Sequence, residues 1–368
     1  MNVLHINRNY LGTTLHQTMV EHLDSLGVKS QVFVPVCRTE IATIKPNKNV
    51  VVSDCFNNVD RYIFDLKQFK IIRAIEKNVD VGSFDVIHAY TLFTDGNAAM
   101  KLAEKYNKPF VVAIRNTDVN DFFAKLFYLR GRGIKIMRAA QKIFFLSEAY
   151  RRTVFEKYIP DKYYDELYAK SLIIPNGIDD FWFNNQPPEE KKEFSNPIKL
   201  IYAGRIDKNK NIPTIKDAMD VLQRKGIKST LTVIGKIADE SEFLKIKDDN
   251  RITYLPAMPK EQLIEQYRKH DIFVMPSFTE SFGLVYAEAI SQGLPVVYSK
   301  GQGFDGQFKE GVVGYHCDAY DVSDVASVIE RVAKEYSTVL LNCVRLAKKF
   351  GWNELCHMYK RVYEGIAC

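Results

Sequence analysis

PSFTESFGLVYAEAISQGLP, residues 276–295, predicts the end of a strand, a loop and a helix in succession. The apolar run DIFVMP (271–276) precedes it and predicts a buried strand, and LPVVYS (294–299) predicts the next one. The helix between them is expected to begin near Gly283. Two short apolar strands joined by a helix are typical of a parallel pair with a crossover connection.

The same unit recurs on both sides of this stretch. In the second half of the chain, strands are predicted at IKLIYAG (198–204), STLTVIG (229–235) and RITYL (251–255), and helices at 212–226 and 260–270. In the first half, strands are predicted at 3–6, 31–36, 84–90, 110–114, 142–147 and within 171–179. Such alternation predicts an α/β protein with two Rossmann-like, doubly wound domains that face each other across a cleft.

Composition indicates where these domains meet. Residues 181–197 are rich in Asn, Pro and charge and have no apolar period, so they are predicted to be a linker. The expected domains are residues 1–180 and 198–345. Residues 346–368 predict a C-terminal helix that packs back toward the first domain, because its aromatic residues recur at helical spacing.

Length and composition exclude several classes of protein. The 368 residues suit two domains, and 46% hydrophobic with 26% charged residues is typical of a soluble globular chain. No apolar run approaches the ~20 residues of a membrane-spanning helix, and the first residues do not resemble a signal peptide, so a cytoplasmic protein is expected. The net charge of +6 is mild, and no nucleic-acid motif or metal-spaced Cys/His cluster is present.

The stretch 276–295 also carries candidate binding groups. Glu280 lies on the loop and Glu288 about one turn into the helix. The backbone N–H groups of Phe282, Gly283 and Leu284 lie at the helix N-terminus, which attracts phosphate. Two carboxylates beside a phosphate site suit hydrogen bonds from sugar and ribose hydroxyls. The alternative is a pair of solvated glutamates.

A second constellation follows the strand at 198–204. Arg205 and Lys210 lie in the loop after Gly204, at the carboxyl edge of the predicted sheet, where the first constellation also lies. A guanidinium and an ammonium at that edge suit a diphosphate leaving group. The alternative is that both are solvated loop cations.

Together these segments resemble the retaining nucleotide-sugar glycosyltransferases of family 4, which have the GT-B fold. The resemblance is carried by the G-R-x-x-x-x-K segment, by the E-x7-E segment and by IPNGID (174–179). It implies that Arg205 and Lys210 grip the donor diphosphate. It also implies that Glu280 holds the transferred sugar and Glu288 binds the ribose, with the amides of residues 282–284 beside them.

The first half resembles the family more loosely. Gly12 stands where the family has a glycine-rich loop, and Arg115 stands where many members have a histidine near the transferred sugar. The segment resembles an R-G-x-D variant, with Asn116 in place of glycine and Asp118 at its end. His88 ends a strand and is expected to face the cleft. The resemblance implies acceptor or sugar contacts for His88, Arg115 and Asp118. The alternative for Gly12 is a plain turn, and the alternative for Arg115 and Asp118 is an Arg–Asp pair that holds the loop. The alternative for His88 is a core histidine.

The resemblance also implies a mechanism. Arg205, Lys210 and Glu280 are the expected catalytic residues of a hexosyltransferase that retains configuration by front-side transfer. No carboxylate pair at glycosidase geometry is evident from the sequence, which argues against a two-step hydrolase. No metal or other cofactor is expected, since no Asp-x-Asp motif is present and a nucleotide-sugar is the substrate. UDP-sugar is the first choice of donor and GDP-mannose the second.

Residues 122–142 indicate a partner for the first domain. This stretch holds six basic residues and no acidic one, interleaved with apolar and aromatic side chains. It suits an anionic membrane surface, at the inner face of the membrane, or a lipid-linked or glycan acceptor in cell-surface polysaccharide or glycolipid synthesis. The alternative is a solvated helix pair whose apolar side packs on its own domain. Other functions left open are a catalytically degenerate partner subunit and a GT-B epimerase or phosphorylase.

Overall fold

The computed structural model describes residues 1–37, 49–187 and 194–367. The chain divides into two compact units. Unit 1 is built from the chain up to Gly177 and from the residues after Gly351, and unit 2 from Ile178–Gly351. A search of the described residues for a helix with the length and hydropathy of a bilayer span finds none.

Unit 1 contains a parallel sheet in the order β3-β2-β1-β4-β5-β6-β7. Its strands are β1 (Asn2–Ile6), β2 (Lys29–Cys37), β3 (Val50–Phe56), β4 (Val86–Ala89), β5 (Phe110–Ile114), β6 (Lys142–Phe145) and β7 (Ser171–Ile173). Its helices are α1 (Leu15–Ser25), α2 (Phe64–Asn78), α3 (Thr94–Tyr106), α4 (Arg130–Ala139), α5 (Glu148–Tyr158), α6 (Tyr164–Lys170) and α14 (Trp352–Ile366).

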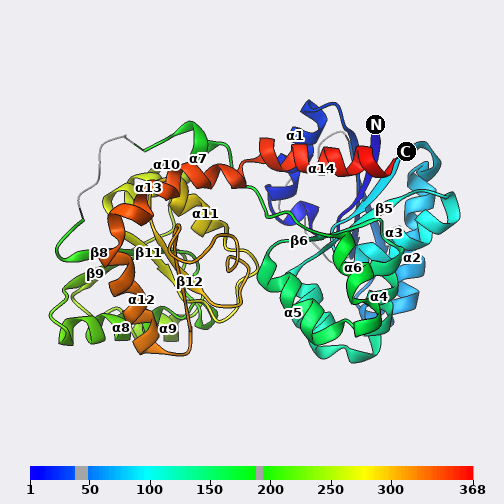
Figure 1. Cartoon of the computed structure of the whole chain (residues 1–368). Helices are drawn as coiled ribbons and strands as arrows, with labels where there is room; N and C mark the ends of the chain where they lie inside the picture. Colours follow the sequence, from blue (N-terminus) through cyan, green and yellow to red (C-terminus); the bar gives the residue numbers. More distant parts are fainter. Residues whose placement is uncertain (38–48, 188–193, 368) are drawn as a thin grey trace. The chain divides into compact units, whose positions relative to one another are not determined.

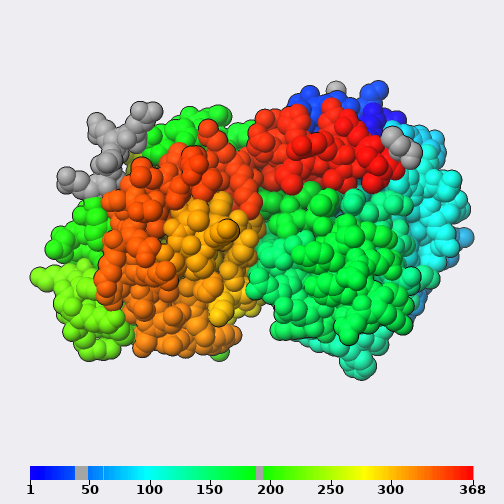
Figure 2. Space-filling view, viewed as in Figure 1, coloured from blue at the N-terminus to red at the C-terminus, as the bar shows by residue number. Residues whose placement is uncertain are grey.

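Alternate residues of each central strand supply two apolar cores, one on each face of the sheet. On β5, Val112 and Ile114 join the core beneath α3 and α4, while Val111 and Ala113 join the core beneath α1 and α14. This is the period of two that a strand buried on both faces requires. The C-terminal helix α14 therefore completes unit 1, and its residues lie beside those of the N-terminal helix α1 (Figures 1 and 2).

Unit 2 contains a parallel sheet in the order β10-β9-β8-β11-β12-β13. Its strands are β8 (Ile198–Ala203), β9 (Ser229–Ile234), β10 (Ile252–Leu255), β11 (Ile272–Met275), β12 (Val296–Ser299) and β13 (Gly314–Cys317). Its helices are α7 (Phe181–Asn184), α8 (Ile212–Arg224), α9 (Glu240–Leu244), α10 (Lys260–Lys269), α11 (Leu284–Ser291), α12 (Val322–Lys334) and α13 (Tyr336–Ala347). Both units are thus doubly wound and Rossmann-like, as the sequence predicts.

The boundaries of the units differ from the predicted ones. Residues 181–187 and 194–197 of the predicted linker are part of unit 2, while 188–193 lie outside the described residues. Trp182 explains the difference, because it is only 2% exposed and packs on Tyr267 at 5.6 Å between ring centroids. One buried tryptophan anchors a segment whose overall composition is that of a linker. The predicted helix at 346–368 is also interrupted, and α14 begins at Trp352.

The strand orders place a topological switch point in each sheet. In unit 1 the order reverses between β1 and β4, and in unit 2 between β8 and β11. Ligands of open α/β sheets bind beyond the carboxyl ends of the strands at such points. The loops that follow β8 and β11 carry the two constellations predicted from the sequence.

Candidate functional site

The loops after β8 and β11 are hydrogen-bonded to each other. The backbone N–H of Phe278 donates to the carbonyl of Asn209 at 2.9 Å. The Asn209 side-chain amide donates to the Thr279 carbonyl at 2.8 Å and accepts from the Thr279 N–H at 3.0 Å. Asn211 donates to the carbonyl of Pro276 at 3.1 Å. These contacts bring the two predicted motifs into one site.

An ion pair joins the motifs directly. Lys210 Nζ lies 2.5 Å from Glu280 Oε2, and the two side chains are 16% and 12% exposed. The Lys210 backbone N–H donates to Asp207 Oδ1 at 3.1 Å, so Asp207 caps the single helical turn Lys208–Lys210. The cap fixes the backbone from which the ammonium group reaches Glu280.

Arg205 is held differently. Its side chain is 69% exposed and pairs with Asp207 at 3.0 Å. Its backbone is fixed, because the buried Tyr202 hydroxyl donates to the Arg205 carbonyl at 2.6 Å. A fixed backbone with a solvated guanidinium can close on an anion at little cost, since an exposed ion pair is worth only about 0–1 kcal/mol.

Glu280 is also positioned through its backbone. Its N–H donates to Gln302 Oε1 at 2.9 Å, and its carbonyl accepts from the Gly303 N–H at 3.0 Å. A side chain on Gly303 would collide with the Ser281 carbonyl, so this close approach requires glycine. The loop after β12 therefore supports the loop that carries Glu280.

The N-terminus of α11 follows at once. Gly283 is its N-cap, with φ +75°, and a side chain there would meet the Tyr286 ring. Phe282 is buried at 2% exposure. The first turn of α11 contains no acidic side chain, which leaves the positive end of the helix dipole uncompensated there by its own residues.

Glu288 lies half-buried on α11. Burial raises its pKa to about 7, and the Asp179 carboxylate adds to the effect. Two contacts lower the pKa of Glu288 instead: the positive charge of Lys260 and a hydrogen bond with Trp182. Lys260 is itself paired with Asp179 at 2.6 Å. Near neutral pH this carboxyl group can donate as well as accept a hydrogen bond, which suits a hydroxyl ligand.

In unit 1, Gly12 and Arg115 lie in the loops after β1 and β5. A side chain on Gly12 would meet nothing within 4 Å, so the fold itself does not require glycine. Arg115 donates from Nε to the Tyr90 carbonyl at 3.3 Å and from Nη1 to Asn176 Oδ1 at 2.9 Å. Asn176 belongs to the IPNGID segment, so the structure joins two parts of the sequence resemblance.

Asp118 is 1% exposed and binds backbone groups. Its carboxylate accepts from the N–H groups of Leu92, Phe93 and Arg115 at 3.0, 3.2 and 2.9 Å. Burial raises its pKa to about 6, although these hydrogen bonds oppose the rise. The side chain therefore ties the loops after β4 and β5 together. The predicted acceptor contact of Asp118 does not fit this burial, and the loop-holding alternative fits, with the Arg115 backbone as the partner.

His88 is a core residue. It is 0% exposed, its Nδ1 lies 2.7 Å from the Tyr363 hydroxyl, and its ring stacks on Tyr90 at 4.3 Å. Burial, with a smaller contribution from His5, lowers its pKa well below 6.5. The expectation that His88 faces a cleft is wrong, because α14 covers it. The sequence does not predict that Asn209, Asn211 and Gln302 hydrogen-bond the unit 2 loops to one another. No local sequence pattern distinguishes these residues from other polar loop residues.

Two family models match the chain, one to each half. Residues 13–180 match "Glycosyltransferase Family 4" and residues 184–350 match "Glycosyl transferases group 1". The chain belongs to the family 4 glycosyltransferases with the GT-B fold.

Relatives of this family 4 glycosyltransferase include a D-inositol 3-phosphate glycosyltransferase of Pseudarthrobacter chlorophenolicus, 26% identical over 296 residues. That match covers 73% of the chain and 66% of the relative. Among solved structures, sucrose-phosphate synthase from Thermosynechococcus elongatus is similar with a TM-score of 0.74 and 15% identity, covering 99% and 98% of the two chains. Anabaena HepE, solved with UDP and glucose, is similar with a TM-score of 0.67 and 14% identity, covering 99% and 100%. The chain is a glycosyltransferase, and it spans about two thirds of the length of the curated Pseudarthrobacter relative.

Proposed function

We propose that this glycosyltransferase moves a hexose from UDP to a hydroxyl group of a glycan or lipid-linked acceptor, with retention of configuration. The observation that carries the proposal is the Lys210–Glu280 ion pair, which joins both predicted motifs at the switch point of the unit 2 sheet. HepE, a structural neighbour, was solved with UDP-glucose, which favours UDP over GDP as the nucleotide of the donor.

The proposed chemistry is charge stabilisation with positioning. Lys210 and Arg205 meet the diphosphate as its leaving oxygen gains charge, and preorganised cations are most effective at such a point. Glu280 accepts hydrogen bonds from the sugar hydroxyls, and Glu288 binds the ribose. The acceptor oxygen bonds to the anomeric carbon on the same face of the sugar from which the diphosphate departs, and the departing phosphate takes the proton of the acceptor hydroxyl. No metal or other cofactor is expected in this step.

Calorimetry with UDP, GDP, ADP and their sugars tests the donor site. UDP and its sugars are expected to bind the wild type and to bind Arg205→Ala at least tenfold more weakly. Lys216→Ala, which removes another unit 2 cation, is the control. NMR of the product would then show the retained anomer. If folded protein binds no nucleotide, the transferase proposal fails and the alternative of a partner subunit gains support.

We also propose that unit 1 contacts an anionic membrane surface through residues 122–142. Three of the basic side chains there form ion pairs with acids elsewhere: Lys125 with Asp121, Arg132 with Asp65 and Arg138 with Glu166. These pairs reduce the charge available to lipids. The aromatic side chains of Phe127 and Tyr128 remain 71% and 67% exposed, so the contact is expected to depend on them.

Vesicle sedimentation separates this proposal from the packing alternative. The double substitution Phe127→Ser with Tyr128→Ser is expected to reduce binding to anionic vesicles at least fivefold. Tyr320→Ser is the matched control, because Tyr320 is an aromatic residue of unit 2 that is even more exposed, at 80%. Equal sedimentation of both variants and the wild type would contradict the proposal.

A further inference from the structure

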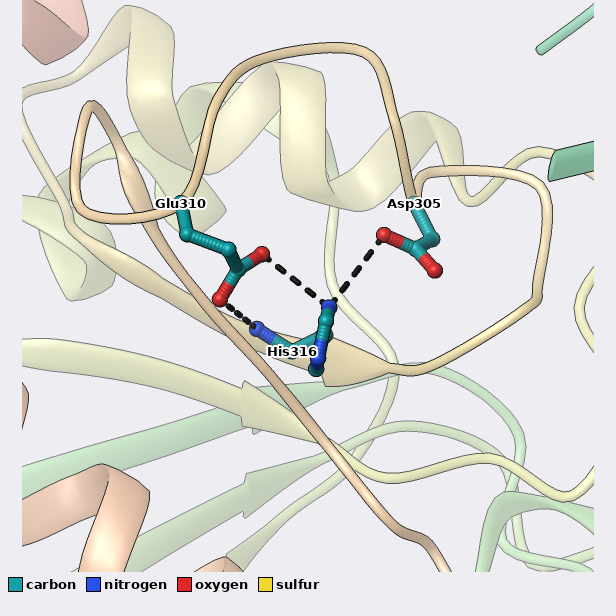
Figure 3. Close-up of side chains that lie close together, drawn as sticks. All are labelled: Asp305, Glu310 and His316. Carbon is teal, nitrogen blue, oxygen red and sulfur yellow. Dashed lines mark hydrogen bonds and ion pairs between the residues drawn. The ribbon is translucent and has the colours of Figure 1, made fainter. Parts of the chain in front are cut away.

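Three side chains on one edge of unit 2 point toward one another (Figure 3). His316 lies on β13, and Asp305 and Glu310 lie on the connection between β12 and β13. His316 Nδ1 is 3.4 Å from Asp305 Oδ1 and 3.1 Å from Glu310 Oε1. One ligand atom of each residue lies within 4.8 Å of the other two. None of the three has a role in the proposed donor site.

These separations match adjacent corners of a coordination polyhedron. Two ligands at about 2.0–2.1 Å from one tetrahedral zinc ion lie roughly 3.3–3.4 Å apart, and octahedral neighbours roughly 3.0 Å apart. One imidazole nitrogen with two carboxylate oxygens is a mixed donor set that suits Zn²⁺ or Mn²⁺, whereas Mg²⁺ and Ca²⁺ prefer oxygen alone.

Each carboxylate is oriented by a further hydrogen bond. The Tyr298 hydroxyl donates to Glu310 Oε1 at 2.9 Å, and the His316 backbone N–H donates to Glu310 Oε2 at 3.2 Å. The Gly301 N–H donates to Asp305 Oδ2 at 2.7 Å. Tyr298 is only 1% exposed, so its hydroxyl is a fixed point. Outer partners of this kind are typical of built metal sites.

The site has room for further ligands. Glu310 and His316 line a cavity of about 400 Å³, together with Asp318. The side chains of the three candidate ligands are 20–40% exposed. An ion bound there would therefore complete its coordination with water, and it could enter from solvent.

We propose that Asp305, Glu310 and His316 bind one Zn²⁺ ion, with Mn²⁺ as the competing ion, and that the ion fixes the connection between β12 and β13. That connection carries Gln302 and Gly303, which hold the backbone of Glu280. The ion would act on the donor site by holding this loop and takes no part in the transfer step. The site itself stands on unit 2 geometry alone, and only its effect on the donor depends on the proposed function.

Titration calorimetry of chelator-treated, tag-free protein with Zn²⁺ alone, and then Mn²⁺ alone, tests the site. One equivalent of ion is expected to bind. Loss of an outer hydrogen-bond partner typically weakens metal binding roughly 10–100-fold, so Tyr298→Phe should weaken it by about tenfold. His316→Gln and Asp305→Asn each remove a ligand, and each should weaken binding by at least roughly 10–100-fold. His357→Gln, which removes an exposed histidine of α14, is the matched control and should bind as the wild type does.

Binding of either ion that requires His316 supports the site. No stoichiometric binding, or binding that His316→Gln leaves unchanged, overturns it and leaves the triad as a polar contact between a histidine and two carboxylates. Circular dichroism tests whether each variant is folded. If His316→Gln is unfolded, the titration of Asp305→Asn takes its place as the test of the site. UDP is expected to bind the chelated protein several-fold more weakly. A protein that binds zinc but no UDP would count against the donor proposal and leave the metal site standing.

Discussion

Replacing Lys210 by methionine tests how strongly the two halves of the candidate donor site depend on each other. The Nζ–Oε2 separation of 2.5 Å corresponds to an attraction of roughly 6–7 kcal/mol at an effective dielectric constant of about 20. Desolvation of both groups offsets most of this. Removing one partner of a buried pair typically costs about 3–5 kcal/mol, and the remaining exposure of 16% and 12% lowers the expected loss to about 2–3 kcal/mol.

A double-mutant cycle measures this coupling. Lys210→Met and Glu280→Gln are each expected to destabilise unit 2 by about 2–3 kcal/mol, and the double variant by about 2 kcal/mol less than the sum. The chain has two tryptophans, Trp182 in unit 2 and Trp352 in unit 1, so a Trp352→Phe background lets Trp182 fluorescence report unfolding of unit 2 in urea.

Additive losses, within about 0.5 kcal/mol, would refute the reasoning, because they would mean that the two charges do not interact in solution. Calorimetry on the same variants gives the functional half of the cycle. UDP-sugar affinity is expected to fall at least tenfold in both single variants. The double variant should not recover it, since both contacts to the donor are then gone.

Three further predictions concern other sites. Burial raises the pKa of Asp95 to about 7, so the folded state holds its proton more tightly than the unfolded state. Stability should therefore fall as pH rises from about 4 to about 7, by up to about 4 kcal/mol, and urea titrations should show Asp95→Asn escaping this loss. Gly12→Ala should leave the unfolding free energy within about 0.5 kcal/mol, so weaker donor binding in calorimetry would identify a ligand contact, and unchanged binding a plain turn. Gly303→Ala should push the Ser281 carbonyl away and reduce UDP affinity more than tenfold with little change in far-UV circular dichroism, and unchanged affinity would contradict that support role.

The buried strands of both sheets could be predicted from short apolar runs. FVVAI predicts β5 at its observed bounds, and the helix at 260–270 differs from α10 by one residue. Two strands at sheet edges, β3 and β13, gave no such signal. An edge strand pairs on one side only, and in β3 exposed and half-buried positions interrupt the apolar run. His316 lies on β13, and Asp305 and Glu310 lie in irregular backbone. The proposed metal site therefore could not be predicted from the sequence.

Some polar residues of the candidate site could also be placed from the sequence, and others could not. Arg205, Lys210 and Glu280 could be placed because each follows a predicted strand, and parallel strands bring their carboxyl ends to one edge. The surroundings of His88 could not be predicted, since its hydrogen-bond partner Tyr363 lies 275 residues further along the chain. Long-range contacts of this kind decide whether a polar side chain at a strand end meets solvent or a helix.

The return of α14 to unit 1 has a consequence for how the protein is made. Trp352 and Tyr363 fill the same core as Met19 and Phe144. A ribosome must add the 174 residues of Ile178–Gly351 before it reaches Trp352, which takes roughly 10–35 s at about 5–20 residues per second. During that time the first domain to be synthesised displays an uncovered apolar face, while the second is contiguous and can finish folding first. Until α14 emerges, that apolar face of the nascent chain can associate with apolar surfaces of neighbouring chains.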